Sequence, residues 1–160
     1  MNIKDLSINP FDIFDNHWAL LASGNKDGFN EMTISWGGMG TFWNKPVVTV
    51  YVRPSRYTFK FMEDNDIFTI SFFDKAYRND LAVLGTKSGR DGDKLAKTKI
   101  KTKFIDDNTI GFNEAKLTLV CRKIFSQFLD VKDPALLKEF YGDNSIHKMY
   151  IGEVIKIIEQ

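Results

Sequence analysis

The sequence predicts a mainly β fold with short helices, arranged as a small closed or half-closed barrel. Six or more segments have the apolar, β-branched or alternating pattern of strands, and the segments with helical spacing are short. The chain has 160 residues, 43% of them hydrophobic and 27% charged, which is the composition of a globular protein. We therefore assign a single domain to residues 1–160. Aromatic residues make up 14% of the chain, which suits either a β-rich core or surfaces that stack on ligands.

The N-terminal part of the chain predicts a hairpin followed by a buried strand. Residues 17–23 (HWALLAS) and 32–36 (MTISW) are expected strands, and residues 24–28 (GNKDG) between them favour a turn. Glycines interrupt the next stretch at 37–40. The run at 46–52 (PVVTVYV) is apolar on both faces, so we expect a buried strand that begins with its proline.

The remainder of the chain alternates short helices with strands. Apolar spacing predicts three helices, over residues 57–64, 77–84 and 134–141. Asp133 is the expected N-cap of the last helix, and Gly142 follows its end. The pattern predicts three further strands, over residues 66–73, 116–124 and 147–158.

Charge and cysteine content argue against several classes of protein. The net charge of +1 argues against a protein built for nucleic acid or acidic membranes, and we expect neither as a partner. The stretch KTKIKTK at 97–103 fits a lysine-protected sheet edge better than a nucleic-acid contact. The single cysteine, Cys121, excludes an intrachain disulfide and a cysteine zinc site. With no signal-peptide pattern and no apolar run near the ~20 residues of a membrane span, we expect a cytoplasmic protein.

Common catalytic motifs are absent from the sequence. The two histidines, His17 and His147, are far apart and belong to no HExxH motif. There is no GxSxG elbow and no GxxxxGK[ST] loop, and the glycines of WGGMG do not match GxGxxG. Zinc proteases, serine hydrolases, P-loop nucleotidases and Rossmann dehydrogenases are therefore disfavoured.

Two loops combine cationic and hydroxyl side chains as a phosphate site requires. Arg53-Pro-Ser-Arg-Tyr-Thr58 lies where the buried strand gives way to a helix. Ser88-Gly-Arg-Asp-Gly-Asp-Lys94 has glycines that would let the backbone approach an anion. The first cluster fits a polar helix cap equally well, and the second, taken alone, fits an ordinary surface turn better. If the two loops converge, they form one phosphate site.

A third motif, NEMTISWGG at 30–38, combines a strand, an aromatic residue and a glycine turn. A flat heteroaromatic ring such as isoalloxazine needs backbone polar groups along its edge and apolar or aromatic cover. Alternation places Thr33 and Ser35 on one face, with Ile34 and Trp36 on the other. For any one of these residues, a plain strand is the better interpretation, with Ile34 and Trp36 in the core and Thr33 and Ser35 exposed to solvent.

In this order, the three motifs resemble the flavin reductase-like, flavoredoxin-type family. The resemblance rests on Asn30-x-Met-Thr-Ile-Ser-Trp36, Val52-Arg-Pro-Ser-Arg-Tyr-Thr58 after Lys45-Pro46, Ser88 to Lys94, and Met149-Tyr-Ile-Gly-Glu-Val154. It spans residue 17 to the end, although the segment 104–146 is hard to align. It implies an FMN-binding split β-barrel that works as a homodimer, with the flavin near the subunit interface.

The resemblance also implies a role for each motif. One group would lie along the isoalloxazine ring: Asn30, Thr33, Ile34, Ser35, Trp36 and Gly37. A second group would hold the ribityl chain and the phosphate: Arg53, Ser55, Arg56, Tyr57 and Thr58. A third would complete the phosphate side: Ser88, Gly89, Arg90 and Lys94. His147 lies where a polar residue close to the flavin is expected, and no residue is assigned as catalytic or metal-binding.

The implied function is that of an FMN-dependent oxidoreductase that takes electrons from NADH or NADPH and passes them to an acceptor. Because the cofactor supplies the redox chemistry, such a protein does not need many histidines. Two alternatives stay open. One is a flavoredoxin-type electron-transfer protein whose FMN exchanges electrons with partner proteins, and the other is a binding or structural domain without a cofactor.

Overall fold

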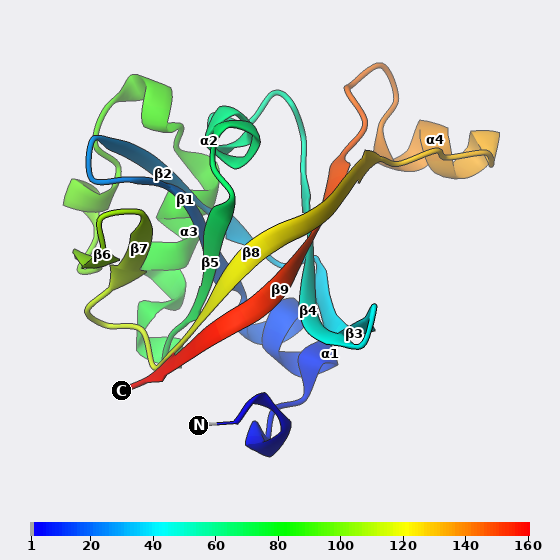
Figure 1. Cartoon of the computed structure of the whole chain (residues 1–160). Coiled ribbons are helices and arrows are strands. Elements are labelled where there is room, and N and C mark those ends of the chain that lie inside the picture. Colours follow the sequence, from blue (N-terminus) through cyan, green and yellow to red (C-terminus); the bar gives the residue numbers. More distant parts are fainter. Residues whose placement is uncertain (1) are drawn as a thin grey trace.

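The computed structural model describes residues 2–160, and most of its regular structure is antiparallel β-sheet (Figure 1). The larger sheet has the strand order β2-β1-β5-β8-β9-β4-β3. Its strands are β1 (Ala19–Asn25), β2 (Gly28–Ile34), β3 (Gly37–Phe42), β4 (Lys45–Val52), β5 (Ile67–Phe72), β8 (Leu117–Phe128) and β9 (Lys148–Glu159). A separate hairpin consists of β6 (Thr102–Asp106) and β7 (Thr109–Phe112). The predicted mainly β fold with short helices is confirmed.

The helices are short and occupy the ends and one face of the sheet. They are α1 (Pro10–Asp12), α2 (Thr58–Asp64), α3 (Arg78–Thr86) and α4 (Pro134–Phe140). Single 3₁₀ turns cover Ile3–Asp5, Lys75–Tyr77, Gly89–Asp91 and Leu95–Lys97, and a π-helical turn covers Ile13–His17. Helices α2 and α3 both contact β2, whereas α4 projects from the far end of β8 and β9 (Figure 1). No helix within residues 2–160 is long and apolar enough to span a membrane.

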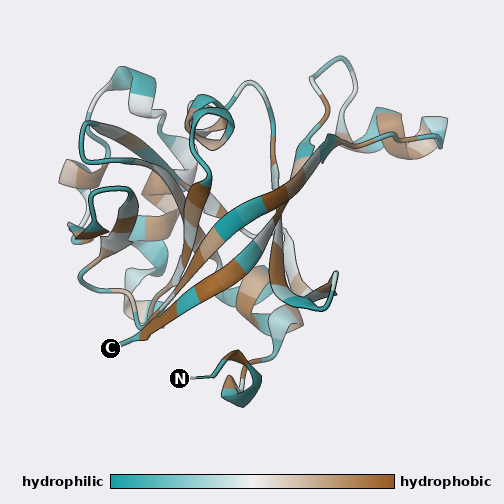
Figure 2. Cartoon of the chain, in the orientation of Figure 1, coloured by the Kyte–Doolittle hydropathy of each residue, from teal (hydrophilic) through white to brown (hydrophobic). Residues whose placement is uncertain are grey.

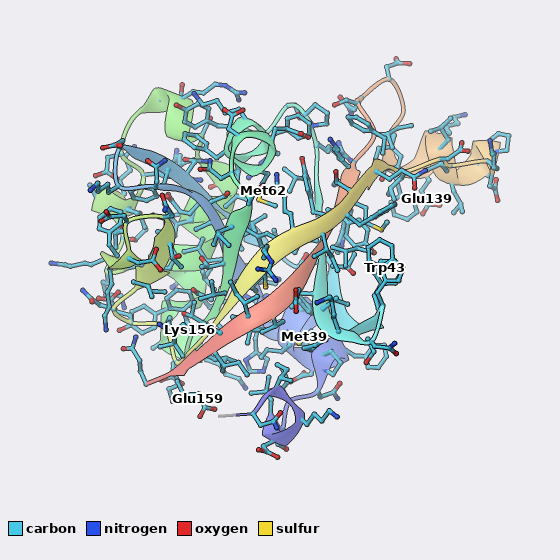
Figure 3. The ribbon with its side chains drawn as sticks, in the orientation of Figure 1. Met39, Trp43, Met62, Glu139, Lys156 and Glu159 are labelled. Atoms are coloured by element: carbon cyan, nitrogen blue, oxygen red, sulfur yellow. The ribbon has the colours of Figure 1, made fainter. Side chains whose placement is uncertain are left out.

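The sheet separates two apolar cores. Ala19 and Leu21 of β1 face the core inside the barrel, while Leu20 and Ala22 face the core under α3 and the β6–β7 hairpin. Successive residues of a strand point to opposite faces, so β1 is buried on both sides. Burial of each leucine contributes roughly 1.5–3 kcal/mol. Met62 of α2 is fully buried in the barrel core, beneath the helix (Figure 3).

The glycines at 37–40 do not interrupt the sheet, so that expectation was wrong. Strand β3 covers them and pairs with β4 from Gly37↔Val50 to Phe42↔Lys45. An edge strand can pair through its backbone alone, so a strand of this kind has no apolar pattern in the sequence from which it could be predicted. A Cβ on Gly37 would lie 2.6 Å from the Phe14 ring, so the close approach of that ring requires glycine here.

The lysine-rich stretch at 97–103 is not one extended strand, and that prediction was also wrong. A 3₁₀ turn ends at Lys97, and β6 begins only at Thr102. Ile100 is almost fully buried in the second core, which draws the chain inward between exposed lysines. The β6–β7 hairpin that follows lies within the segment for which the sequence pattern predicted no element.

The C-terminal elements agree with prediction and extend it. The Asp133 carboxylate accepts a hydrogen bond from the Ala135 N–H at 2.8 Å, and Gly142 has φ of +54° just past α4. Strand β8 continues four residues beyond its predicted end at residue 124. Paired with β9, it forms a long ribbon whose apolar and polar residues alternate in Figure 2.

Candidate functional site

The two cationic loops meet in space, as a common phosphate site requires. Residues 53–58 connect β4 to α2, residues 88–94 follow α3, and both line a cavity of about 160 Å³. Arg90 Nη1 donates a hydrogen bond to the Ser55 carbonyl at 2.9 Å, which ties one loop directly to the other. Strand β2 supplies the third wall through Asn30 and Met32.

The wall of this cavity, which we call the phosphate cavity, is rich in hydrogen-bond donors and positive charge. Its lining residues are Asn30, Met32, Ser55, Arg56, Tyr57, Thr58, Thr86, Lys87, Ser88, Gly89, Arg90 and Lys94. Guanidinium, ammonium and hydroxyl groups together are the donor set that binds a phosphate. The residues present therefore fit the phosphate end of a flavin mononucleotide.

Buried contacts fix the three walls relative to one another. Asn30 Nδ2 donates to Thr58 Oγ1 at 2.8 Å, and both side chains are buried. A Cβ on Gly89 would collide with the Asn30 carboxamide and the Tyr57 ring, so glycine lets the second loop pack against the first. The cavity is thus held by contacts within the protein.

Two cations of the cavity are also anchored to α3. Arg56 Nη2 donates to the Gly85 carbonyl at 3.2 Å, and the buried Lys94 Nζ donates to the carbonyls of Leu84 at 3.0 Å and Lys87 at 3.4 Å. These carbonyls form the negative end of the helix dipole, which favours a cation. An ammonium group has three donors, so Lys94 retains one for a ligand.

Burial of the charged Arg56 and Lys94 side chains costs free energy when no anion is bound beside them. It lowers the pKa of the Arg56 guanidinium and of the Lys94 ammonium. For Lys94, the negative charge of Glu31 opposes the decrease in pKa and the positive charge of Arg56 adds to it. An anion between Arg56 and Lys94 would offset the desolvation of both groups.

Thr33 and Ile34, predicted to lie along a flavin ring, are committed to contacts within the protein. The Thr33 hydroxyl donates to the Leu81 carbonyl of α3 at 2.5 Å. Ile34 is buried in the barrel core. Alternation along β2 places these residues on opposite faces of the strand, and both faces are covered.

Ser35, Trp36 and Gly37 follow the end of β2 and line a separate groove of about 370 Å³. Phe14 and Tyr51 also line it. Trp36 is 53% exposed, so its indole ring is available for stacking. The structure therefore divides the predicted site into the phosphate cavity and this second region, which we call the Trp36 groove.

Arg53 and His147 lie at the Trp36 end and do not line the phosphate cavity. The His147 ring contacts the Trp36 ring with a centroid distance of 5.5 Å, and its Nδ1 is 2.8 Å from the Tyr141 hydroxyl. Arg53 Nη2 donates to the Phe140 carbonyl at 2.8 Å. Burial, with the charge of Arg53, lowers the pKa of His147 to about 4, so its imidazole is neutral at physiological pH.

Sequence reasoning missed four residues at the site. Met32, Thr86 and Lys87 line the phosphate cavity. The sequence contained a signal for each of them: Met32 is two residues from Asn30 on the same strand face, and Thr86 and Lys87 immediately precede the second loop. Glu31 is almost fully buried behind the cavity, and its signal was a lone carboxylate in an otherwise uncharged strand.

Comparison with known proteins identifies the family. Residues 12–160 match the sequence profile described as the flavin reductase like domain, so the chain belongs to this family. The curated protein sequences contain no significant match to it. The match agrees with the resemblance expected from the motifs.

Solved structures show the same fold at low sequence identity. Flavoredoxin from Methanosarcina acetivorans has a TM-score of 0.69 at 20% identity, covering 98% of this chain and 75% of that one. An FMN-binding protein from Thermus thermophilus has a TM-score of 0.73 at 15% identity, covering 100% and 81%. A split barrel domain protein from Shewanella frigidimarina has a TM-score of 0.72 at 16% identity, covering 99% and 77%. The fold is therefore the split barrel, and the family and these neighbours support FMN as the cofactor.

Proposed function

We propose that this chain is an FMN-dependent oxidoreductase that takes electrons from NADH or NADPH and passes them to a second acceptor. The observation that carries the proposal is the phosphate cavity, where two cationic loops converge beside β2. When bound, FMN supplies reversible uptake of electrons, and the protein supplies its placement and surroundings.

The residues of the chain divide the work of binding between the two ends of the ligand. Arg56 and Lys94 neutralise the phosphate, and the hydroxyls of Ser55 and Ser88 donate hydrogen bonds to it. At ~3.3 Å per residue, β2 separates Asn30 from Ile34 by roughly 13 Å, and Trp36 follows beyond. This spacing suits an extended ligand with its phosphate at one end and a planar ring at the other.

Near the ring, His147 contributes a polar group without positive charge. Its pKa of about 4 keeps the imidazole neutral, and its contact with the Tyr141 hydroxyl fixes the ring orientation. No step requires the imidazole to act as an acid or base. Its role in this proposal is to orient the ligand beside Trp36.

A flavoredoxin-type electron carrier is the second candidate function. Flavoredoxins from Methanosarcina acetivorans and from Desulfovibrio vulgaris are among the structural neighbours, each with a TM-score of 0.69. The half-exposed Trp36 supports this candidate because an accessible ring end would allow a partner protein to approach.

We also propose that the protein works as a homodimer. The outer part of the β8–β9 ribbon and α4 project from the barrel (Figures 1 and 2). Phe128, Leu136 and Phe140 of this arm each leave about half of their side chains exposed, as does Trp43 at the β3–β4 turn (Figure 3). A second copy would cover such apolar surface. Sedimentation velocity tests this: Leu136→Glu should shift a dimer toward monomer, and a wild-type monomer that binds FMN fully would contradict the proposal.

We place the protein in the cytoplasm. Cys121 is fully buried, and burial raises the pKa of its thiol, so it remains protonated and unreactive. A lone unpaired thiol suits a reducing compartment. Fractionation of cells expressing the chain tests this location.

An absorbance spectrum followed by rapid mixing tests the main proposal. Protein incubated with FMN and passed through a desalting column should retain the flavin band near about 450 nm. Anaerobic mixing with NADH or NADPH should then bleach that band within the time of a catalytic turnover. Retained flavin that neither nucleotide bleaches would favour the electron carrier. A colourless protein would overturn both candidates.

A further inference from the structure

A larger cavity of about 700 Å³ lies beside the phosphate cavity. The two cavities share Asn30, Tyr57, Gly89 and Lys94 in their walls. Glu31 lines only the larger one, yet it is 4% exposed. Lys94 is therefore common to both cavities, and it carries a positive charge between a phosphate site and a buried carboxyl group.

The carboxyl group of Glu31 is not neutralised by a close ion pair. The ion pairs with N···O distances up to 4 Å among residues 2–160 do not include it. A buried carboxylate without such a partner is costly, so its neutral form is favoured. Burial raises the pKa of Glu31 to about 7, with the charge of Lys94 opposing the increase and that of Asp93 adding to it.

The other charges around Glu31 leave Lys94 as the main group favouring its ionised form. Strand β1, which pairs with β2, carries no charged residue. Asp80 of α3 is paired with Lys99 at 3.8 Å. Of the other charged residues, Asp93 and Lys101 line the same cavity, and Lys60 of α2 and Arg90 contact the ring of Tyr57 in its wall. Arg56 acts on Lys94 from the phosphate cavity.

We propose that Glu31 takes up a proton from solvent when a phosphate group binds in the phosphate cavity. The inference rests on the proposed function for its ligand, FMN. A bound phosphate brings ~1.5–2 negative charges to Lys94 and so cancels the positive charge that favours ionised Glu31. The larger cavity gives the carboxyl group a path to water, and the proton adds to a carboxylate oxygen with no other bond changed.

The coupling has a measurable size. If phosphate binding raises the pKa of Glu31 by about one unit from its value near 7, about 0.4 of a proton is taken up per FMN at pH 7. The affinity for FMN then falls about fourfold between pH 6.5 and pH 8. The phosphate itself, with a second pKa of about 6, would release at most about 0.1 of a proton at pH 7 on entering a cationic site.

Isothermal titration calorimetry of FMN at pH 7, in two buffers of different ionisation enthalpy, measures this uptake directly. Wild-type protein should take up a net ~0.3 of a proton with FMN, which is the ~0.4 taken up by Glu31 less the ~0.1 released by the phosphate. It should take up close to none with riboflavin, which lacks the phosphate. Glu31→Gln keeps the size of the side chain and should abolish the uptake with FMN. The comparison of FMN with riboflavin uses wild-type protein alone, so it decides the question even if the variant folds poorly.

The outcomes separate this inference from the proposed function. If wild-type protein binds FMN without proton uptake, or with equal uptake for riboflavin or for Glu31→Gln, the coupling is refuted and the FMN site stands. If FMN does not bind at all, the proposed function is refuted, and the coupling with it.

Discussion

Replacement of Arg56 by alanine tests whether the phosphate cavity binds an anion. Arg56 is half-buried and lines the cavity, and its side chain makes one hydrogen bond within the protein, to the Gly85 carbonyl at 3.2 Å. Its remaining donors have no other hydrogen bond within residues 2–160. A guanidinium held in this way is well placed to form a bidentate contact with phosphate.

The expected loss follows from the strength of a charge-assisted contact. Removal of such a contact costs about 1.5–3 kcal/mol, which is roughly a ten- to hundredfold rise in the Kd for FMN. The Kd for riboflavin should change little, because riboflavin has no phosphate. Titration monitored by quenching of flavin fluorescence gives both constants. Arg56→Lys should weaken FMN binding less, since it retains the charge and loses the fork geometry.

A control variant separates a local effect from a change in overall charge. Lys97→Ala removes one positive charge at an exposed position that does not line the phosphate cavity, so FMN affinity should be unchanged. An Arg56→Ala variant with wild-type affinity for FMN would show that the loop after β4 only caps α2. A marked loss in Lys97→Ala would show that the site lies elsewhere.

Two further predictions concern stability. Burial raises the pKa of Glu63, but hydrogen bonds from Lys148 and Tyr150 and the charges of Lys148 and Lys123 outweigh it and hold the pKa below its ordinary value. The ionised Glu63 therefore stabilises the folded state above about pH 4.5, and this stabilisation is lost as the pH falls through the folded-state pKa. Glu63→Gln should lower the free energy of unfolding by about 1 kcal/mol at pH 7, measured by urea unfolding, and should make stability depend less on pH in the acid range. Gly152→Ala should cost about 1–3 kcal/mol in thermal unfolding, because its Cβ would lie 2.5 Å from the Phe68 ring, whereas Gly40→Ala meets no neighbouring atom and should be tolerated; equal behaviour of the two variants would refute the packing argument.

Much of the fold could be predicted because its strands carry their own pattern. The strand 46–52 is β-branched and buried, and β4 covers Lys45–Val52. Helix α4 has its predicted cap at Asp133, since capping depends on residues that are neighbours in sequence. Where local chemistry determines the structure, the sequence is sufficient.

The errors fall where contacts distant in sequence determine the structure. Glycines at 37–40 form β3 because β4 offers a partner and the Phe14 ring leaves no room for a side chain. The lysine-rich stretch bends because Ile100 enters a core whose other members come from distant segments. Neither contact leaves a local signal in the sequence.

The candidate site shows the same division. Its loops could be named from residue chemistry, but only the fold brings them to one cavity. Arg53 belongs to the same sequence motif as Arg56, yet its guanidinium points to the Phe140 carbonyl and contacts Tyr141. Two arginines three residues apart therefore lie at opposite ends of the candidate site, and the motif alone does not predict which end each one occupies.

The two ends of the site also differ in exposure, and this difference bears on how the protein would discriminate among flavins. Lys94 and Thr58 in the phosphate cavity are buried and hydrogen-bonded, whereas Trp36 is half-exposed. Binding free energy that depends on desolvated charge is concentrated at the phosphate end. Loss of the phosphate should therefore reduce affinity far more than a change to the ring. A flavin whose ring is altered but whose phosphate is kept should still bind. That result would show that the site holds its ligand mainly by the phosphate, whereas loss of binding would show that it selects the ligand by the ring.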